Sequence, residues 1–220
     1  MNRQSFYSFI SGSLIAGSLF QGGNRNCNAA LLHPNGPDGG RKIAGEQSGR
    51  IIGQHPPRGY AHGHEIIVSD PNQQYVVRLE DLASGQLLSA AKFGSWHYIL
   101  TQGTNLVGKA VLSQDEKTGE LKLAGVYDPG PPLDAEREAL RRAEKLPQVQ
   151  KQDYEFRLLD IEPLYFHAVW LHGKSDDIIL PLPETFRRMK VYEPYSESQM
   201  IKLLKPEAKK ALNNTPRQIR

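Results

Sequence analysis

Short apolar runs separated by turn-forming residues fill the chain from Glu65 to Leu182, and this pattern restricts the fold more than any other feature of the sequence. Each run is too short for an ordinary helix and is rich in β-branched and aromatic residues, as strands are. Between the runs, Gly, Asn and Asp supply the backbone conformations that tight turns need. The pattern predicts a mostly antiparallel sheet of about eight or nine strands. The strands are expected at residues 66–68, 75–79, 86–92, 96–101, 106–112, 121–127, 154–159, 164–171 and 177–182.

A central helix is expected between the two blocks of strands. Asp134 is placed to cap residues 135–146, which are good helix formers with an apolar stripe on one side, and Pro147 follows the helix. In the second block, the run 164–171 has mostly apolar residues at both odd and even positions. That run is therefore expected to be a central strand covered on both faces.

A second helix is expected near the C-terminus. Ser196 and Gln199 have the spacing of a capping box, in which each residue bonds the backbone N–H of the other, so a helix is expected from Glu197. Pro206 is expected to break or kink it. The chain is thus predicted to be an α+β protein with one central and one C-terminal helix, preceded by a disordered N-terminal arm.

The domain boundaries follow from the same patterns. One α+β domain is expected over residues 65–205, since a chain of 220 residues is long enough for one ordinary domain. Residues 206–220 are expected to be a basic tail. The absence of interleaved aromatic residues there argues against a nucleic-acid site. Cys27 is the single cysteine, so no intramolecular disulfide can form.

Residues 1–64 have the composition of a flexible leader and linker. The segment 3–20 is apolar and Ser-rich and follows Arg3, so it resembles a signal peptide and implies export, with a cytoplasmic location as the alternative. It is too short and too polar for a transmembrane helix. Residues 33–63 are dominated by Gly, Pro, Asn and Gln, which predicts a linker without regular structure.

One stretch of the second block resembles a known group of sequences. It reads Tyr-Glu-Phe-Arg-Leu-Leu at 154–159 and Leu-Tyr-Phe-His-Ala-Val-Trp-Leu at 164–171. This resembles a core stretch, Y-E-x-R-L-L followed by L-Y-x-x-A-x-W-L, of a group of bacterial proteins, and it implies a fold but no activity and no site. A helix followed by three antiparallel strands is also similar in topology to PepSY and cystatin-like modules, which fold a curled sheet over a helix and often bind or inhibit.

The sequence offers one candidate metal site. His62, His64 and Glu65 lie together, and two His at i and i+2 of an extended chain point the same way, so they could share Zn²⁺ or Cu²⁺. Further ligands would have to come from elsewhere in the chain. His97 and His167 are candidate general bases, because imidazole titrates near neutral pH.

The sequence is compatible with two functions. The first is a non-catalytic binding domain that recruits a protein or peptide partner through its sheet, with the N-terminal arm as a tether. The alternative is a small metal-dependent or hydrolytic enzyme that uses a cluster of these histidines. The chain has no GxSxG, HExxH, P-loop or GxGxxG motif, and this weakens the enzyme hypothesis.

Overall fold

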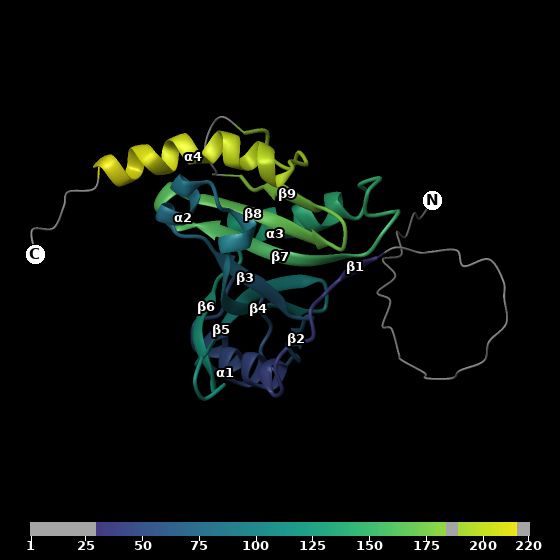
Figure 1. Ribbon diagram of the computed structural model, residues 1–220. Coiled ribbons are helices and arrows are strands. Elements are labelled where there is room, and N and C mark those ends of the chain that lie inside the picture. The colour runs from purple at the N-terminus through teal and green to yellow at the C-terminus, as the bar shows by residue number, and fades with distance from the viewer. Residues whose placement is uncertain (1–29, 184–188, 215–220) are drawn as a thin grey trace, which may run out of the picture.

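A computed structural model of the chain describes residues 30–183 and 189–214. In the described residues, nine strands form one sheet, most of whose pairs are antiparallel, and four α-helices pack on it (Figure 1). The α+β class and the mostly antiparallel sheet are therefore confirmed. The expectation of one central and one C-terminal helix is wrong in number, because two further helices are present.

The main path of the sheet has the order β6-β5-β4-β3-β7-β8-β9. Neighbouring strands pair antiparallel except β3 and β7, which run parallel and join the two blocks of strands. Two short strands lie off this path: β1 pairs parallel with β7, and β2 pairs antiparallel with β4. The strands are β1 (Leu31–Leu32), β2 (Ile67–Val68), β3 (Asn72–Val76), β4 (Lys92–Gln102), β5 (Asn105–Gln114), β6 (Leu121–Tyr127), β7 (Tyr154–Ile161), β8 (Phe166–Gly173) and β9 (Asp177–Pro181).

One face of the sheet carries three helices. Paired residues lie on the same face, and Trp96, Gln73, Arg157 and Trp170 form such a row across β4, β3, β7 and β8. Trp96 belongs to the core beneath α1 (Gly40–Gln54), and Trp170 belongs to the core beneath α2 (Leu79–Ser84) and α4 (Glu197–Asn214). Figure 1 shows α1 against the β4–β6 half and α4 over the β8–β9 half.

The other face carries α3 (Pro131–Ala143). Ser95, Gln74, Leu158 and Val169 form the corresponding row on this side, and the last two belong to the core packed beneath α3. β8 is buried on both faces, as expected for the run 164–171. The β4–β6 half of this face, unlike the opposite one, has no long helix of the described residues lying along it.

The start of α3 differs from the expected cap at Asp134. The helix begins at Pro131, and Asp134 lies in its first turn. Proline has no N–H to lose at a helix start and its fixed φ suits that position, so two prolines place the start earlier than the carboxylate cap would. Asp134 still contributes as a negative charge near the positive end of the helix.

Helix α1 lies in the segment that was expected to be a linker without regular structure. Its buried residues are Gly40, Ala44, Ser48 and Ile52, which repeat every four positions and form one small-residue face. A Cβ atom added at Gly40 would lie 2.3 Å from the Tyr98 hydroxyl, so only glycine allows this close approach. Packing against the sheet outweighs the poor helix propensity of the segment.

The segment between β3 and β4 also differs from expectation. Strands were expected at 75–79 and 86–92, but residues 79–84 form α2 and residues 88–90 form a 3₁₀ turn. Acidic residues in the first turn of α2 favour its N-terminus, and Gly85, with φ 102°, ends it. The Leu88 N–H donates to Glu197 Oε1 at 2.8 Å, which ties this segment to α4.

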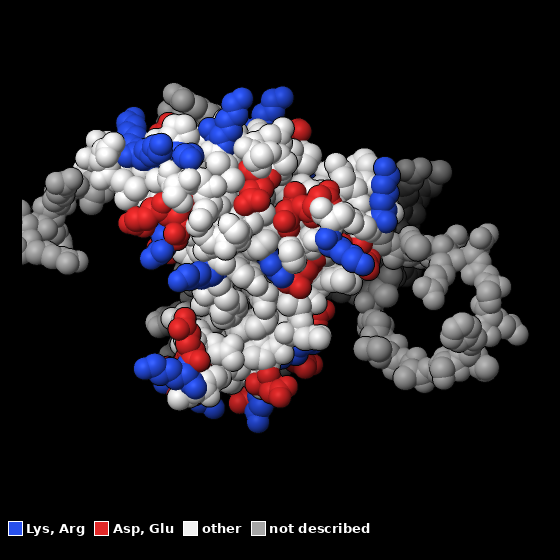
Figure 2. Space-filling view, in the orientation of Figure 1, with Lys and Arg blue, Asp and Glu red and all other residues white. Residues whose placement is uncertain are grey.

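The predicted capping box at the start of α4 is confirmed. The Ser196 N–H donates to Gln199 Oε1 at 2.8 Å, and the Gln199 N–H donates to Ser196 Oγ at 3.3 Å. The helix then continues through Pro206 to Asn214, because Ala208 is fully buried in the core that α4 shares with α2 and the sheet, and so extends the apolar face. Figure 2 shows blue Lys and Arg side chains gathered over α4 at the top of the view.

The signal peptide and the transmembrane helix considered in the sequence analysis have different outcomes. The signal-like segment 3–20 lies outside the described residues. Among the residues that are described, no helix is both long and apolar enough to cross a bilayer.

Candidate functional site

A cavity of about 430 Å³ lies on the α3 face of the sheet, where the first turns of α3 meet the β3, β4, β5, β7 and β8 strands. Its volume is within the range of small-molecule sites. Polar and apolar side chains share the wall. Those that carry hydrogen-bonding or charged groups are Gln74, His97, Lys109, Tyr127, Glu136, Asp160, Glu162 and His167.

The wall has a buried floor and an exposed rim. His97, Leu158 and Leu182 are more than nine-tenths buried and belong to the floor. Tyr127 at the end of β6 is 58% exposed, and Pro131 at the start of α3 is also exposed, so these residues lie at the rim. A ligand that enters the cavity would thus pass a rim that combines the Tyr127 and Pro131 rings with the exposed Glu162 carboxylate.

An ion pair lies in the wall of the cavity. Lys109 Nζ on β5 donates to Glu136 Oε1 on α3 at 2.6 Å, and the two side chains are only 12% and 11% exposed. Burial raises the pKa of Glu136, and the Lys109 ammonium partly opposes that rise. The pair joins the helix to the β4–β6 half of the sheet across the cavity.

The ring of His97 is oriented by its neighbours. Gln74 donates its amide N–H to Asp160, so its Oε1 faces Ser95 Oγ at 2.6 Å and His97 Nε2 at 3.2 Å. An amide oxygen only accepts hydrogen bonds, so His97 Nε2 must carry the proton. Ser95 Oγ lies 2.9 Å from the same nitrogen and accepts from it. In neutral imidazole the second nitrogen, Nδ1, then has a free lone pair.

That second nitrogen has no partner among the described residues. His97 Nδ1 is buried and makes no hydrogen bond, although buried polar atoms are nearly always paired. The pKa of His97 is lowered to about 3, mainly by burial and also by the nearby Lys109 charge, while Asp160 opposes the shift. His97 is therefore a neutral acceptor at physiological pH, in the floor of the cavity.

A second histidine of the cavity is paired with a carboxylate. His167 Nδ1 on β8 lies 2.9 Å from Asp160 Oδ1 on β7 and donates to it. This hydrogen bond raises the pKa of His167, and burial opposes the rise in part. Asp160 uses one oxygen for His167 and the other for Gln74, so the carboxylate holds both groups in place.

Replacing His167 by glutamine is expected to change how stability depends on pH. A histidine whose pKa is raised by folding stabilises the protein below the unfolded pKa of about 6.5, and this contribution is lost as pH rises through the folded value. The difference in unfolding free energy between wild type and His167→Gln should therefore shrink from about pH 6 to about pH 9. Urea denaturation at both pH values measures it.

The partner variant Asp160→Asn serves as the control for that experiment. Without the carboxylate, the effect of a further His167→Gln change should depend less on pH, because Asp160 is the largest cause of the raised pKa of His167 and only the attraction of Glu136 still raises it. A wild-type difference that grew with rising pH would contradict the assigned hydrogen bond.

Ser95 is not placed to serve as a nucleophile toward a ligand in the cavity. Ser95 and His97 are within hydrogen-bond distance, but Ser95 is not among the residues that line the cavity. Its hydroxyl donates to Gln74, behind the ring. No Ser, Thr or Cys of the described residues lines the cavity.

The residues predicted to bind Zn²⁺ lie elsewhere. His62, His64 and Glu65 are exposed in the loop between α1 and β2, where the His62 ring packs edge-on against Tyr60. In residues 30–183 and 189–214, no group of three or more His, Cys, Asp or Glu side chains is placed to hold a metal ion. The metal site stays a prediction.

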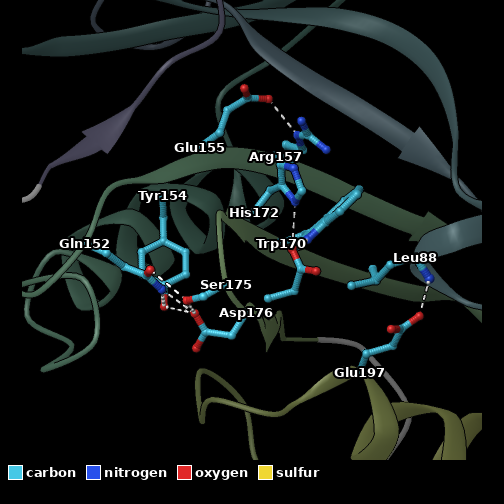
Figure 3. Close-up of polar contacts among 11 residues, drawn as sticks. Leu88, Gln152, Tyr154, Glu155, Arg157, Trp170, His172, Ser175, Asp176 and Glu197 are labelled. Carbon is cyan, nitrogen blue, oxygen red and sulfur yellow. Dashed lines mark hydrogen bonds and ion pairs between the residues drawn. The ribbon is translucent and has the colours of Figure 1, made fainter.

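Another polar cluster lies on the opposite face of the sheet (Figure 3). Asp177 accepts from Trp170 Nε1 at 2.7 Å and pairs with His172 Nδ1 at 2.8 Å, and Glu155 pairs with Arg157 at 2.6 Å. The Arg157 guanidinium also lies over the Trp170 ring at 4.7 Å. These groups satisfy one another and hold β7, β8 and β9 together, so the cluster is explained by structure.

Sequence reasoning found two members of the cavity wall, His97 and His167, and missed the ion pair. A signal for Lys109 was present, because a lysine inside the apolar run 106–112 needs a partner when the strand is buried. Glu136 gave no such signal, since a helix that follows Asp134 is rich in charged residues on its exposed side.

Comparison with known proteins adds no identification. No family model, no curated protein and no solved structure matches the chain. The resemblance of residues 154–171 to a bacterial group, and the likeness to PepSY and cystatin-like modules, therefore stay predictions.

Proposed function

We propose that this protein is a non-catalytic binding domain whose cavity beneath the start of α3 holds a small organic ligand. The observation that carries the proposal is the cavity of about 430 Å³, whose wall brings the polar groups of His97, Lys109, Glu136, Asp160 and His167 together with apolar side chains. Apolar walls with a few converging polar groups are typical of small-molecule sites.

The proposal keeps the non-catalytic binding function expected from sequence, but the occupant is a small organic ligand in place of a protein or peptide. It is preferred to the enzyme alternative because no Ser, Thr or Cys nucleophile of the described residues lines the cavity. The polar groups of the wall are instead fixed by one another, as the Asp160, Gln74 and Ser95 contacts show. Such fixed groups favour recognition.

Filling the cavity is expected to abolish ligand binding. Ala135 lines the cavity from α3 and is 5% exposed, so Ala135→Leu would place three extra carbon atoms in it. We expect fragments that perturb the His97 ring resonances of the wild type in NMR spectra to leave those of Ala135→Leu unchanged. A fragment library screened against both proteins measures this.

Arg137→Leu is the matched control, because Arg137 is exposed on the same helix and does not line the cavity. It should bind the same fragments as wild type. Thermal unfolding of both variants checks that they are folded. If no fragment perturbs His97 in wild type, or if Ala135→Leu binds as well as wild type, the cavity is not a ligand site.

A further inference from the structure

The chemistry of the cavity wall selects among small ligands. We infer that the cavity takes a small cationic amine, whose N–H groups donate to Glu136 near the Asp160 and Glu162 carboxylates while a short apolar body lies at the rim. This inference rests on the proposed function. Three features of the described residues support it: an unfilled acceptor in the wall, an excess of negative charge, and a helix start without available amide donors.

The first feature is an acceptor in the wall that the described residues leave unfilled. Glu136 accepts from Lys109 through Oε1, and among the described residues it has no other hydrogen-bond donor. His97 Nδ1 also lacks a partner, but the atom has no surface open to the cavity, so it is not a contact for the ligand. The unfilled position of Glu136 calls for a ligand that donates, and a protonated amine donates up to three hydrogen bonds.

The charge of the wall points to the same class. Glu136, Asp160 and Glu162 face the cavity with one permanently charged cation, Lys109. With Glu136 ionised, as its pairing with the Lys109 ammonium favours, the three carboxylates outnumber the cations of the wall. A negative wall favours a cation and disfavours a carboxylate or phosphate, and the effect is large in a sheltered cavity where water screens little.

The start of α3 does not offset this preference. Helix N-termini often bind anions through their free N–H groups. Here Pro131 and Pro132 have no N–H, and the N–H groups of Leu133 and Asp134 donate to Gly130 O at 3.0 Å. Of the four backbone positions that would hold an anion, two have no N–H and two already donate to Gly130 O. The helix end therefore interacts with an anion only through its partial positive charge.

The rim sets the rest of the ligand. The Tyr127 ring and the Pro131 and Pro132 rings are exposed at the edge of the cavity, and together they present an apolar and aromatic surface. A tyrosine face also attracts cations, as the Lys109 ammonium 5.8 Å from the Tyr127 ring centre shows. An amine with a ring or short chain would fit both zones.

Benzylamine, benzyl alcohol and benzoate test the inference, because they share one ring and differ in the charge of the head. Titration calorimetry at millimolar concentrations suits compounds of this size. Benzylamine should bind at least about tenfold more tightly than benzoate and should shift the His97 ring resonances. Glu162→Gln removes one rim carboxylate without disturbing the core, and it should weaken benzylamine about two- to fivefold.

Glu116→Gln is the control, since Glu116 is an exposed carboxylate away from the cavity, and it should leave benzylamine affinity unchanged. If benzyl alcohol or benzoate perturbs His97 and binds as tightly as benzylamine, the amine assignment is overturned and cavity binding stands. If neither these three compounds nor any fragment of the library perturbs His97, both the assignment and the proposed function fail.

Discussion

Replacement of Lys109 by methionine is expected to lower the unfolding free energy by about 3–5 kcal/mol, the usual cost of removing one partner of a buried ion pair. Methionine keeps the length and most of the apolar volume of the lysine side chain. What the variant loses is the charge 2.6 Å from Glu136, whose side chain is only 11% exposed. The carboxylate then stays buried without compensation, or binds a proton. Equilibrium urea denaturation at about pH 7 measures the loss.

Two comparisons separate the ion pair from other effects. Lys109→Met combined with Glu136→Leu should recover most of the lost stability, because the double variant buries no charge. Lys122→Met breaks a pair of similar length, 3.1 Å to Glu120, but both of its side chains are about two-thirds exposed. That variant should lose less than about 1 kcal/mol. Equal losses for Lys109→Met and Lys122→Met would mean that the cavity pair is solvated.

Acidification is expected to destabilise the wild type more than a His97→Gln variant. Folding lowers the pKa of His97 from about 6.5 to about 3 because the ring is buried, and the Lys109 charge reinforces the shift while Asp160 opposes it. The unfolded chain then binds a proton that the folded protein does not, so the stability present above about pH 6.5 is lost as pH falls. The expected slope is about 1.4 kcal/mol per pH unit.

The measured quantity is the difference in unfolding free energy between wild type and His97→Gln at about pH 7.5 and about pH 4.5. Other groups titrate in both proteins, so their contributions largely cancel in the difference. The wild type should lose its advantage over the variant as pH falls. Parallel pH profiles would show that the His97 ring is accessible to water and titrates normally.

The sequence predicted those parts of the fold that depend on local signals. The capping box at Ser196 is an example, because both of its hydrogen bonds join residues three positions apart. The hairpins between β4 and β5 and between β8 and β9 are others, since Gly103 supplies a positive φ in the first and the Gly173 N–H donates to Asp176 O in the second. Such features need no information from distant parts of the chain.

Features that depend on distant packing could not be predicted in the same way. Helix α1 is stabilised by a small-residue face that fits against Tyr98. From the sequence alone its glycines indicate a loop, because the surface against which they pack belongs to a distant strand. The cavity is a stronger case, because Lys109 and Glu136 come from elements that only the finished sheet brings together. Local propensity says nothing about that distance.

The parallel pairing of β3 with β7 has a consequence for the order in which the protein folds. The two strands are far apart in sequence, so their pairing closes a long loop and is expected to be a late, slow step. The cavity takes Gln74 and His97 from one side of this seam and Asp160 and His167 from the other, so it exists only after closure. A ligand of the cavity should therefore slow unfolding and leave the rate of folding unchanged.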